Sequence, residues 1–248
     1  MESTQVTPMP LWPPMYTVKK STRSKQVRLS IHPHTGLTIH LPHRSKYSVD
    51  IESLLIKKKS WILKHLASLP PPSLREQIAL PAALDLKAID ETWQIEYKFN
   101  CTKPSLFAAP GFRLVVLDKA PNLTCSLRLL HTWLKRQAET HLAPWLSQLS
   151  LKHNLPFNKV QIRHQKTLWG SCSSAHNIQL NYKLLFLPRN LAEHVLLHEL
   201  SHTKHLNHSR SFWRLLSQCD PNCAQHNSAL RNIESELPAW LYTERLPR

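Results

Sequence analysis

The chain has 248 residues, of which 42% are hydrophobic, enough to bury one large core or two small ones. It contains no run of about 18 apolar residues, and residues 1–4 do not begin a basic segment followed by an apolar one, so we expect neither a membrane-spanning helix nor a secretory signal. The five cysteines are scattered and odd in number, which argues against a disulfide framework and favours a cytoplasmic location. The formal net charge of +16 suits nucleic acid, anionic lipid or acidic protein partners, but it also suits a basic solvated surface.

The amino-terminal part of the chain is predicted to be rich in strands. Residues 1–15 contain many Pro and Met and are expected to form a flexible tail. Apolar and polar residues alternate over 27–31 and again over 37–41, with a His-Thr-Gly sequence between them, which predicts a β-hairpin. A helix is expected over about 49–69, and residues 92–117 contain further alternating segments typical of short strands.

The middle of the chain is predicted to combine a long helix with short strands. Apolar residues recur at helical spacing over about 126–150, where Pro144 is expected to interrupt or kink the helix. Residues 160–163 predict a short strand, the Trp-Gly-Ser-Cys-Ser sequence at 169–173 resembles a turn, and the strong alternation over 177–184 predicts another strand. This mixture of separate strand-rich and helical stretches predicts an α+β fold.

The pentapeptide at 198–202, His-Glu-Leu-Ser-His, has the most specific chemical pattern in the chain. It lies in an apolar segment for which Asn190 is a good helix N-cap, with Glu193 completing a capping-box pair. Two histidines four residues apart share one face of a helix, so His198 and His202 can bind one zinc ion through neutral imidazoles. Glu199 stands beside the first histidine, where it can accept a proton from a water on the metal, and it is the candidate catalytic residue. The alternative is a buried helix with incidental histidines, because the chain contains 16 of them.

A third metal ligand is expected a few residues downstream. Asn207 tolerates the left-handed conformation found at helix ends, so a turn there can bring His208 back to the ion. The spacing of the three histidines also matches the metzincin-type pattern H-E-x-x-H-x-x-G-x-x-H, except that His205 stands where that pattern needs glycine. We therefore predict His208 as the third zinc ligand and His205 as a solvated or neighbouring histidine.

The carboxy-terminal segment is predicted to be helical. Ser209 is a good N-cap for one helix, and a last helix is expected over about 224–237. Cys219 and Cys223 are four residues apart with His226 nearby, so a second metal site is conceivable. A single C-x-x-x-C is a weak signal, however, and ordinary thiols are the preferred interpretation.

Several segments taken together resemble the YgjP-like family of predicted zinc metallopeptidases, which is related more distantly to SprT-like proteins. The matching segments are 169–173, 177–181, 198–202 and 207–209, followed by Phe212 and Trp213. The amino-terminal hairpin and residues 59–62 match more loosely, so the resemblance covers most of residues 16–240. One departure is His176, where the family often has glycine. This difference affects the expected geometry of the local turn but not the metal ligands.

The resemblance implies a zincin-like carboxy-terminal part, with a short sheet and the H-E-x-x-H helix. It implies zinc held by His198, His202 and His208, with Glu199 as catalytic base, but it does not supply a substrate. The expected organisation is a tail (1–15), an amino-terminal β-rich region (16–122) and a zincin-like catalytic region (123–248), with one continuous domain over 16–240 as the alternative.

The leading functional hypothesis is a zinc metallopeptidase that acts on peptide or protein substrates. The alternatives are a basic nucleic-acid-associated protein with a structural zinc site and an inactive peptide-binding module. Residues 1–66 contain 11 Lys and Arg against 3 Asp and Glu, which predicts weak, non-specific and salt-sensitive nucleic-acid binding. The presence of Glu199 favours catalysis, since a purely structural site needs no base.

Other side chains are weaker candidates for a part in the reaction. Tyr182 and His164 are candidate oxyanion stabilisers, with a structural or solvated side chain as the alternative for each. Cys172 has no evident activating partner and is interpreted as a buried structural thiol. The strand over 177–184 can line the cleft and pair with an extended peptide, with an ordinary core strand as the alternative.

Overall fold

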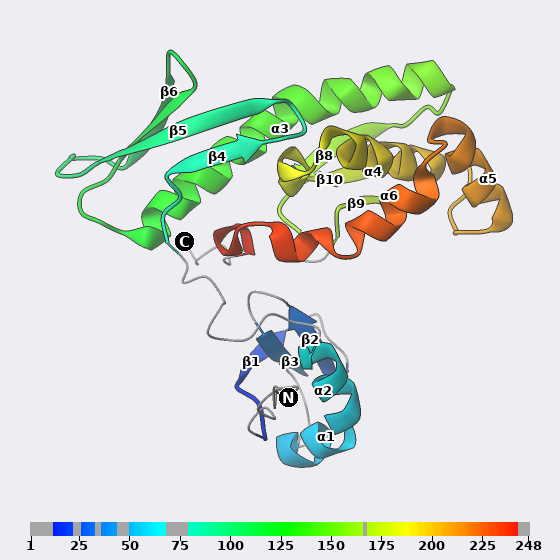
Figure 1. Cartoon of the computed structure of the whole chain (residues 1–248), viewed down its shortest axis with the longest axis horizontal. Coiled ribbons are helices and arrows are strands. Elements are labelled where there is room, and N and C mark those ends of the chain that lie inside the picture. The colour runs from blue at the N-terminus through cyan, green and yellow to red at the C-terminus, as the bar shows by residue number, and fades with distance from the viewer. Residues whose placement is uncertain are drawn as a thin grey trace, which may run out of the picture. The chain divides into compact units, whose positions relative to one another are not determined.

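The computed structural model describes residues 12–21, 26–32, 36–43, 50–67, 79–165 and 168–242. Its strands and helices confirm the predicted α+β class (Figure 1). The chain folds as two compact units, Met1–Gln77 and Ile78–Arg248, and each unit has its own hydrophobic core. Most of the predicted flexible tail, residues 1–11, lies outside the described residues.

The first unit contains a three-stranded sheet made of β1 (Tyr16–Ser21), β2 (Arg28–His32) and β3 (Gly36–Pro42), in the order β1-β3-β2. Strands β2 and β3 pair antiparallel in the register Leu29↔Ile39, which confirms the predicted hairpin. Strand β1 pairs parallel with the other edge of β3. The alternation of apolar and polar residues therefore sets the pairing as well as the strands themselves.

The helix predicted for this unit forms as two short helices, α1 (Ile51–Lys57) and α2 (Lys59–Ala67). Asp50 caps the first helix by accepting a hydrogen bond from the Ser53 backbone N–H at 3.1 Å. Lys58 lies between the helices with φ −104° and ψ 9°, outside helical geometry, and this residue divides the predicted helix. The buried core of the unit consists of Leu37, Ile39, Leu55 and Ile62.

The second unit begins with a four-stranded sheet in the order β4-β5-β7-β6. Its strands are β4 (Ala83–Leu86), β5 (Glu91–Lys98), β6 (Ser105–Ala109) and β7 (Arg113–Leu117), which confirms the strands predicted over 92–117. Strands β6 and β7 contact α3 (Leu123–His153), the longest helix of the described residues. Helix α3 also contacts β8 and α4, so it links this sheet to the part of the unit that holds the histidine motif.

Helix α3 runs without a break through Pro144, so the predicted interruption is wrong. Pro144 removes the N–H that would bond to the carbonyl of Thr140, but Thr140 is exposed and water can reach that carbonyl. On the opposite side, Leu142, Trp145 and Leu146 are buried in the core. The buried residues that precede and follow Pro144 in the sequence therefore hold the helix together despite the lost hydrogen bond.

A second sheet contains β8 (Lys159–Arg163), β9 (Gly170–Cys172) and β10 (Asn177–Asn181), in the order β8-β10-β9. The 169–173 segment, expected to be a turn, instead supplies the edge strand β9, which pairs antiparallel with β10. The turn follows it and includes His176, whose φ of +53° is the left-handed geometry for which glycine is usual. Strand β10 is shorter than predicted, because the Asn181 side chain accepts a hydrogen bond from Lys183 N–H and begins a 3₁₀ helix over Tyr182–Phe186.

Three helices complete the second unit: α4 (Arg189–Ser201), α5 (Arg210–Cys219) and α6 (Cys223–Leu230). Ser209 caps α5 as predicted, accepting a hydrogen bond from Phe212 N–H. Asn190 does not cap α4, because the helix already begins at Arg189 and Pro188 holds the cap position. The last predicted helix ends early at Leu230 and is followed by a separate 3₁₀ turn.

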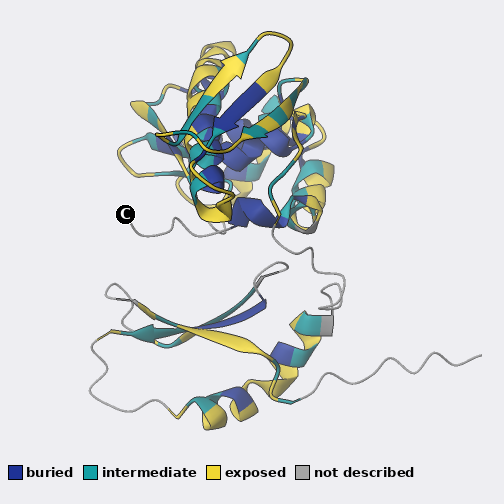
Figure 2. Ribbon diagram, turned by 90° about the vertical axis from the view of Figure 1, so that its left-hand side faces the viewer, coloured by how far each residue is buried: buried dark blue, intermediate teal, exposed yellow. Residues whose placement is uncertain are grey.

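The four-stranded sheet and the helices around the histidine motif share one core (Figure 2). Leu84 and Leu114 from the sheet are fully buried in it, and Ala88 N–H donates to the Leu185 carbonyl at 3.0 Å. The division between the two compact units falls between 77 and 78. The predicted regions 16–122 and 123–248, with one continuous domain over 16–240 as the alternative, stay a prediction. No helix in the described part of the chain has both the length and the apolarity needed to cross a bilayer.

Candidate metal centre

Helix α4 carries His198, and His202 follows as the residue that caps its C-terminal end. Most of the other side chains in the second half of the helix form a buried apolar surface. Leu196 and Leu200 are fully buried, which fixes the helix against the core. The two imidazole ring centroids are 4.9 Å apart, as the four-residue spacing predicts. Glu199, which follows His198 in the sequence, is only 5% exposed.

His208 returns to these two histidines from the loop that joins α4 to α5. After Ser201 the chain tightens through hydrogen bonds from Lys204 and His205 N–H to the Ser201 carbonyl. The turn therefore starts at the end of α4, and Asn207 is not among the described residues with positive φ, contrary to its predicted role as helix terminator. The His208 ring centroid lies 5.0 Å from that of His198 and 4.8 Å from that of His202.

The three histidines form a donor set that fits a divalent metal ion of the zinc type. One nitrogen from each lies within 4.8 Å of the others, and the Nε2 atoms of His198 and His208 are 3.0 Å apart. Burial, together with the neighbouring histidines, lowers the pKa of His198 to about 3, so this ring is neutral and has a lone pair to offer. His202 donates its Nδ1–H to the His205 carbonyl at 2.9 Å, which leaves its Nε2 as the acceptor. His205 itself contributes no donor atom to the group.

Phe212 packs against all three imidazoles and is fully buried. Its ring centroid lies 4.9, 4.6 and 4.8 Å from those of His198, His202 and His208, respectively. Trp213 stacks on His208 at 5.8 Å. From the sequence, Phe212 had a place in the family resemblance but no part in the metal site. Its position four residues after His208, just inside the helix capped by Ser209, is the signal that could have suggested its contact with the histidines.

Glu199 lies directly against the backbone of Gly170 in the edge strand β9. A Cβ atom at position 170 would be 2.7 Å from both Cγ and Oε1 of Glu199, so no larger residue fits without displacing the carboxyl group. Burial raises the pKa of Glu199 to about 8. Its Oε2 is buried and finds no hydrogen-bond partner among the described residues, which is typical of a group whose partner is a substrate, a water or an ion.

Cys172 lies two residues beyond Gly170 and is partly buried. Burial, and to a lesser extent the charge of Glu199, raises the pKa of its thiol to about 11. The thiol is therefore protonated near neutral pH and is a poor nucleophile, in agreement with the structural role preferred from the sequence.

The two candidate oxyanion stabilisers belong to a different cluster. The Tyr182 hydroxyl is 2.7 Å from His131 Nδ1, and His164 donates its Nε2–H to the Leu241 carbonyl at 3.0 Å. The rings of Tyr182 and His164 lie 5.1 Å apart, and both pack against His131. The structure thus brings them together with each other and gives both a packing role, rather than grouping them with the three metal-binding candidates.

A scan against protein-family models matched residues 25–233 to the family described as YgjP-like, metallopeptidase domain. Searches of curated proteins and of solved structures returned no match to this chain. The matched segment covers most of the chain and includes the three histidines, Glu199 and Gly170. The match therefore extends over both units.

Proposed function

Since this chain belongs to the YgjP-like family of metallopeptidase domains, we propose that it is a zinc-dependent peptidase. One observation carries the proposal: three histidine nitrogens lie within 4.8 Å of one another beside a buried carboxyl group that lacks a partner among the described residues. A structural zinc site would need the ligands but not the carboxyl group.

The proposed roles follow from the position of each side chain. His198, His202 and His208 hold the ion, and Phe212 keeps their rings in place. Bound zinc supplies a Lewis acid that polarises a peptide carbonyl and lowers the pKa of a water to about 7. Glu199 would accept the proton lost by the attacking water and would then pass it to the leaving amine. The carboxyl is suited to this shuttle because burial raises its pKa, while a nearby cation favours its charged form.

The substrate is proposed to be an extended peptide lying along β9. The sheet order β8-β10-β9 makes β9 the edge strand, while β10, which the sequence suggested for this role, is central. An edge strand offers backbone N–H and C=O groups to an added strand. Strand β9 also contacts α4 and carries Gly170, which lies against Glu199, so a peptide paired there would pass close to the proposed base.

The decisive variant is Glu199→Gln, which is nearly isosteric but cannot accept a proton. We expect it to keep its zinc and its fold while hydrolysis of a denatured protein or peptide mixture falls by about 10²–10⁴-fold. Zinc content is measured by elemental mass spectrometry and cleavage by peptide mass spectrometry. His205→Ala is the matched control and should retain both the zinc and the rate of peptide hydrolysis. If zinc-loaded Glu199→Gln turned over substrate as fast as the parent chain, the proposed role of Glu199 would be wrong.

A further inference from the structure

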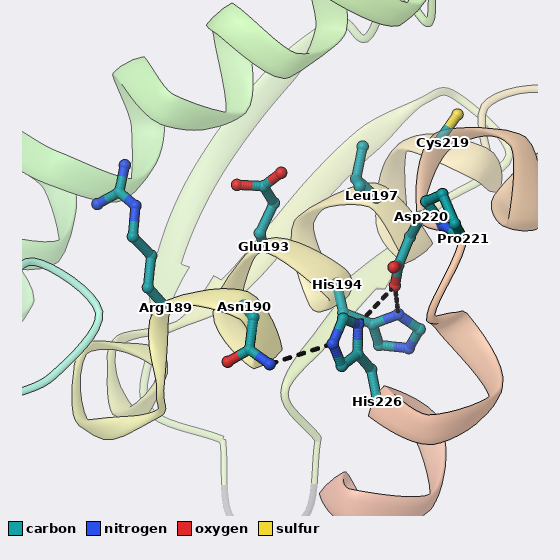
Figure 3. A pocket seen from close by; sticks show the side chains of 9 residues that line it. All are labelled: Arg189, Asn190, Glu193, His194, Leu197, Cys219, Asp220, Pro221 and His226. Atoms are coloured by element: carbon teal, nitrogen blue, oxygen red, sulfur yellow. Dashed lines mark hydrogen bonds and ion pairs between the residues drawn. The ribbon is translucent and has the colours of Figure 1, made fainter.

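A second group of metal-ligating side chains lies elsewhere along α4. His194, Asp220 and His226 each offer a donor atom, and these atoms lie within 4.8 Å of one another. Figure 3 shows them converging from α4, from the segment between α5 and α6, and from α6, at one side of a cavity of about 510 Å³. None of the three belongs to the site formed by His198, His202 and His208.

The centre of this group is one carboxylate oxygen. Asp220 Oδ2 accepts hydrogen bonds from His194 Nδ1 at 2.6 Å and from His226 Nδ1 at 2.8 Å. The other oxygen, Oδ1, accepts from Asn222 N–H at 3.1 Å. On the far side of the His226 ring, the Asn190 side-chain amide donates to Nε2 at 3.1 Å, which fixes the ring with its Nδ1 toward Asp220.

Among the described residues, no lysine or arginine balances the charge of Asp220. Asp220 is 7% exposed and His194 only 1%. Within that part of the chain, the only ion-pair contacts of Asp220 are with these two histidines. Buried carboxylates in proteins are generally paired with a cation or bound to a metal. Here the two imidazoles are the side chains that contact the carboxylate, and both are also metal-binding groups.

We propose that His194, Asp220 and His226 form a second binding site for a divalent transition-metal ion, for which zinc is the best-suited probe. Two imidazole nitrogens and one carboxylate oxygen are donors that zinc accepts, with a fourth position left for water from the cavity. On binding, the proton of each ligating Nδ1 would be carried on Nε2 of the same ring instead, and the Asn190 side chain would turn its amide oxygen toward His226 Nε2 to accept it. Tetrahedral zinc at its usual bond lengths separates its donors by about 3.3 Å. His194 Nδ1 and His226 Nδ1, at 2.6 and 2.8 Å from Asp220 Oδ2, would therefore each move away from that oxygen by about 0.5 to 0.7 Å. His226 is only partly buried and borders the cavity, which gives its ring room for this movement.

The proposed site does not use the cysteines that suggested a second metal site in the sequence. Neither Cys219 nor Cys223 contributes a donor to the group. In Figure 3 the Cys219 sulfur points away from the His194, Asp220 and His226 side chains. Burial raises the pKa of the Cys219 thiol, which also disfavours the thiolate that a metal requires.

The test is the zinc content of the purified full chain after equilibration with zinc and removal of the free ion. We expect two zinc ions per chain in the parent protein and one in Asp220→Asn and in His226→Gln. His198→Ala should also retain one, and its combination with Asp220→Asn none. Asp118→Asn replaces another buried aspartate, outside both groups, and serves as the matched control that keeps two.

Two results would overturn the proposal. One is a single zinc in the parent chain that Asp220→Asn leaves unchanged, which would make the group a His–Asp–His hydrogen-bond network only. The other is a second zinc that survives in both Asp220→Asn and His226→Gln, which would place that ion elsewhere. Anomalous diffraction at the zinc edge locates each ion in the parent protein, so the test does not depend on the folding of a variant. Peptide hydrolysis does not enter the readout, and the outcome is therefore independent of the proposed peptidase activity.

Discussion

At the scale of single residues, the absence of a side chain at Gly170 allows the Glu199 carboxyl group to occupy its position. In Gly170→Ala the new Cβ would meet Glu199 at 2.7 Å, and the carboxyl group must move away. Because small displacements of catalytic groups are costly, we expect peptide hydrolysis to fall by about 10²-fold while zinc is retained. Steady-state kcat/KM and zinc content, measured on the same preparation, check this.

Gly111→Ala is the matched control for this substitution. Gly111 has φ +78°, but a Cβ there would meet no atom within 4 Å. Only backbone strain is expected, with a loss of about 1 kcal/mol in the free energy of unfolding and normal hydrolysis. A Gly170→Ala variant as active as this control would show that the close approach to Glu199 is unimportant.

Lys183 provides a second prediction at this scale, concerning pH. The side chain is 1% exposed, with its ammonium 3.9 Å from the Tyr242 ring centroid, and burial lowers its pKa to about 8. The unfolded chain, where the pKa of lysine is about 10.4, binds the proton more tightly than the folded chain. The contribution of Lys183 to the free energy of unfolding is therefore least favourable below pH 8 and rises by about 3 kcal/mol between pH 8 and 10.4.

Lys183→Met should remove this rise and stabilise the protein at pH 7, as measured by chemical denaturation between pH 7 and 10. The exposed Lys87 supplies the control, because Lys87→Met makes the same charge change at the surface. Measurements stop at pH 10 because burial also raises the pKa of Tyr242, whose ionisation in the unfolded chain would oppose the trend. An identical pH dependence in both variants would contradict the prediction.

The positions that were predictable from the sequence are those that depend on local spacing. His198, His202 and Glu199 lie within one helical turn or so, and the structure brings His208 to them. The contact of Gly170 with Glu199 joins residues 29 positions apart in the sequence. The grouping of His194 with Asp220 spans 26 positions. Contacts of this kind depend on the packing of whole elements, and no sequence spacing encodes them.

At the scale of elements, α3 shows that packing can override a local helix breaker. The cost of Pro144 is the missing backbone hydrogen bond and the crowding of the preceding turn. Pro144→Ala removes both, so we expect the free energy of unfolding to rise by up to about 3 kcal/mol. Thermal and denaturant unfolding measure this change.

Gln148→Ala, at an exposed position of α3, is the control for the general helix preference of alanine. It should change the free energy of unfolding by less than about 0.5 kcal/mol. If Pro144→Ala were no more stable than this control, α3 would already have relaxed around the proline.

Helices and strands that follow from alternation or capping within their own sequence were predicted correctly. Those that form because of contacts with another element were not. The β2–β3 hairpin and the Ser209-capped α5 follow from alternation and capping within a few residues. Strand β9 has only three residues, and it is a strand because β10 pairs with it. The start of α4 at Arg189, one residue before the expected cap, likewise depends on its surroundings: the Arg189 side chain donates to the Ala88 carbonyl at 3.1 Å.

At the scale of the whole molecule, the two possible divisions of the chain predict different behaviour for fragments. A fragment of residues 78–248 contains the complete larger core and should fold with a cooperative transition and bind zinc. A fragment of residues 123–248 lacks the four-stranded sheet, including Trp93, whose ring packs against Trp133 of α3. We expect this shorter fragment to aggregate or remain partly unfolded.

Circular dichroism, thermal unfolding and zinc content distinguish the two fragments. A well-folded, zinc-binding 123–248 fragment would support the division first suggested by the sequence. Residues 1–77, absent from both fragments, include the whole basic segment, residues 1–66. Weak, salt-sensitive nucleic-acid binding by that segment remains a prediction from its composition.

The ring of Phe212 touches all three metal-binding candidates and is itself fully buried. The three imidazoles therefore pack against one buried aromatic ring. They cannot move apart to accept a larger ion or a higher coordination number unless α5 also moves. Selectivity among ions then becomes a property of the hydrophobic core as well as of the donor atoms. Substitutions that loosen this core, far from any ligand, are expected to widen the range of ions that the protein accepts.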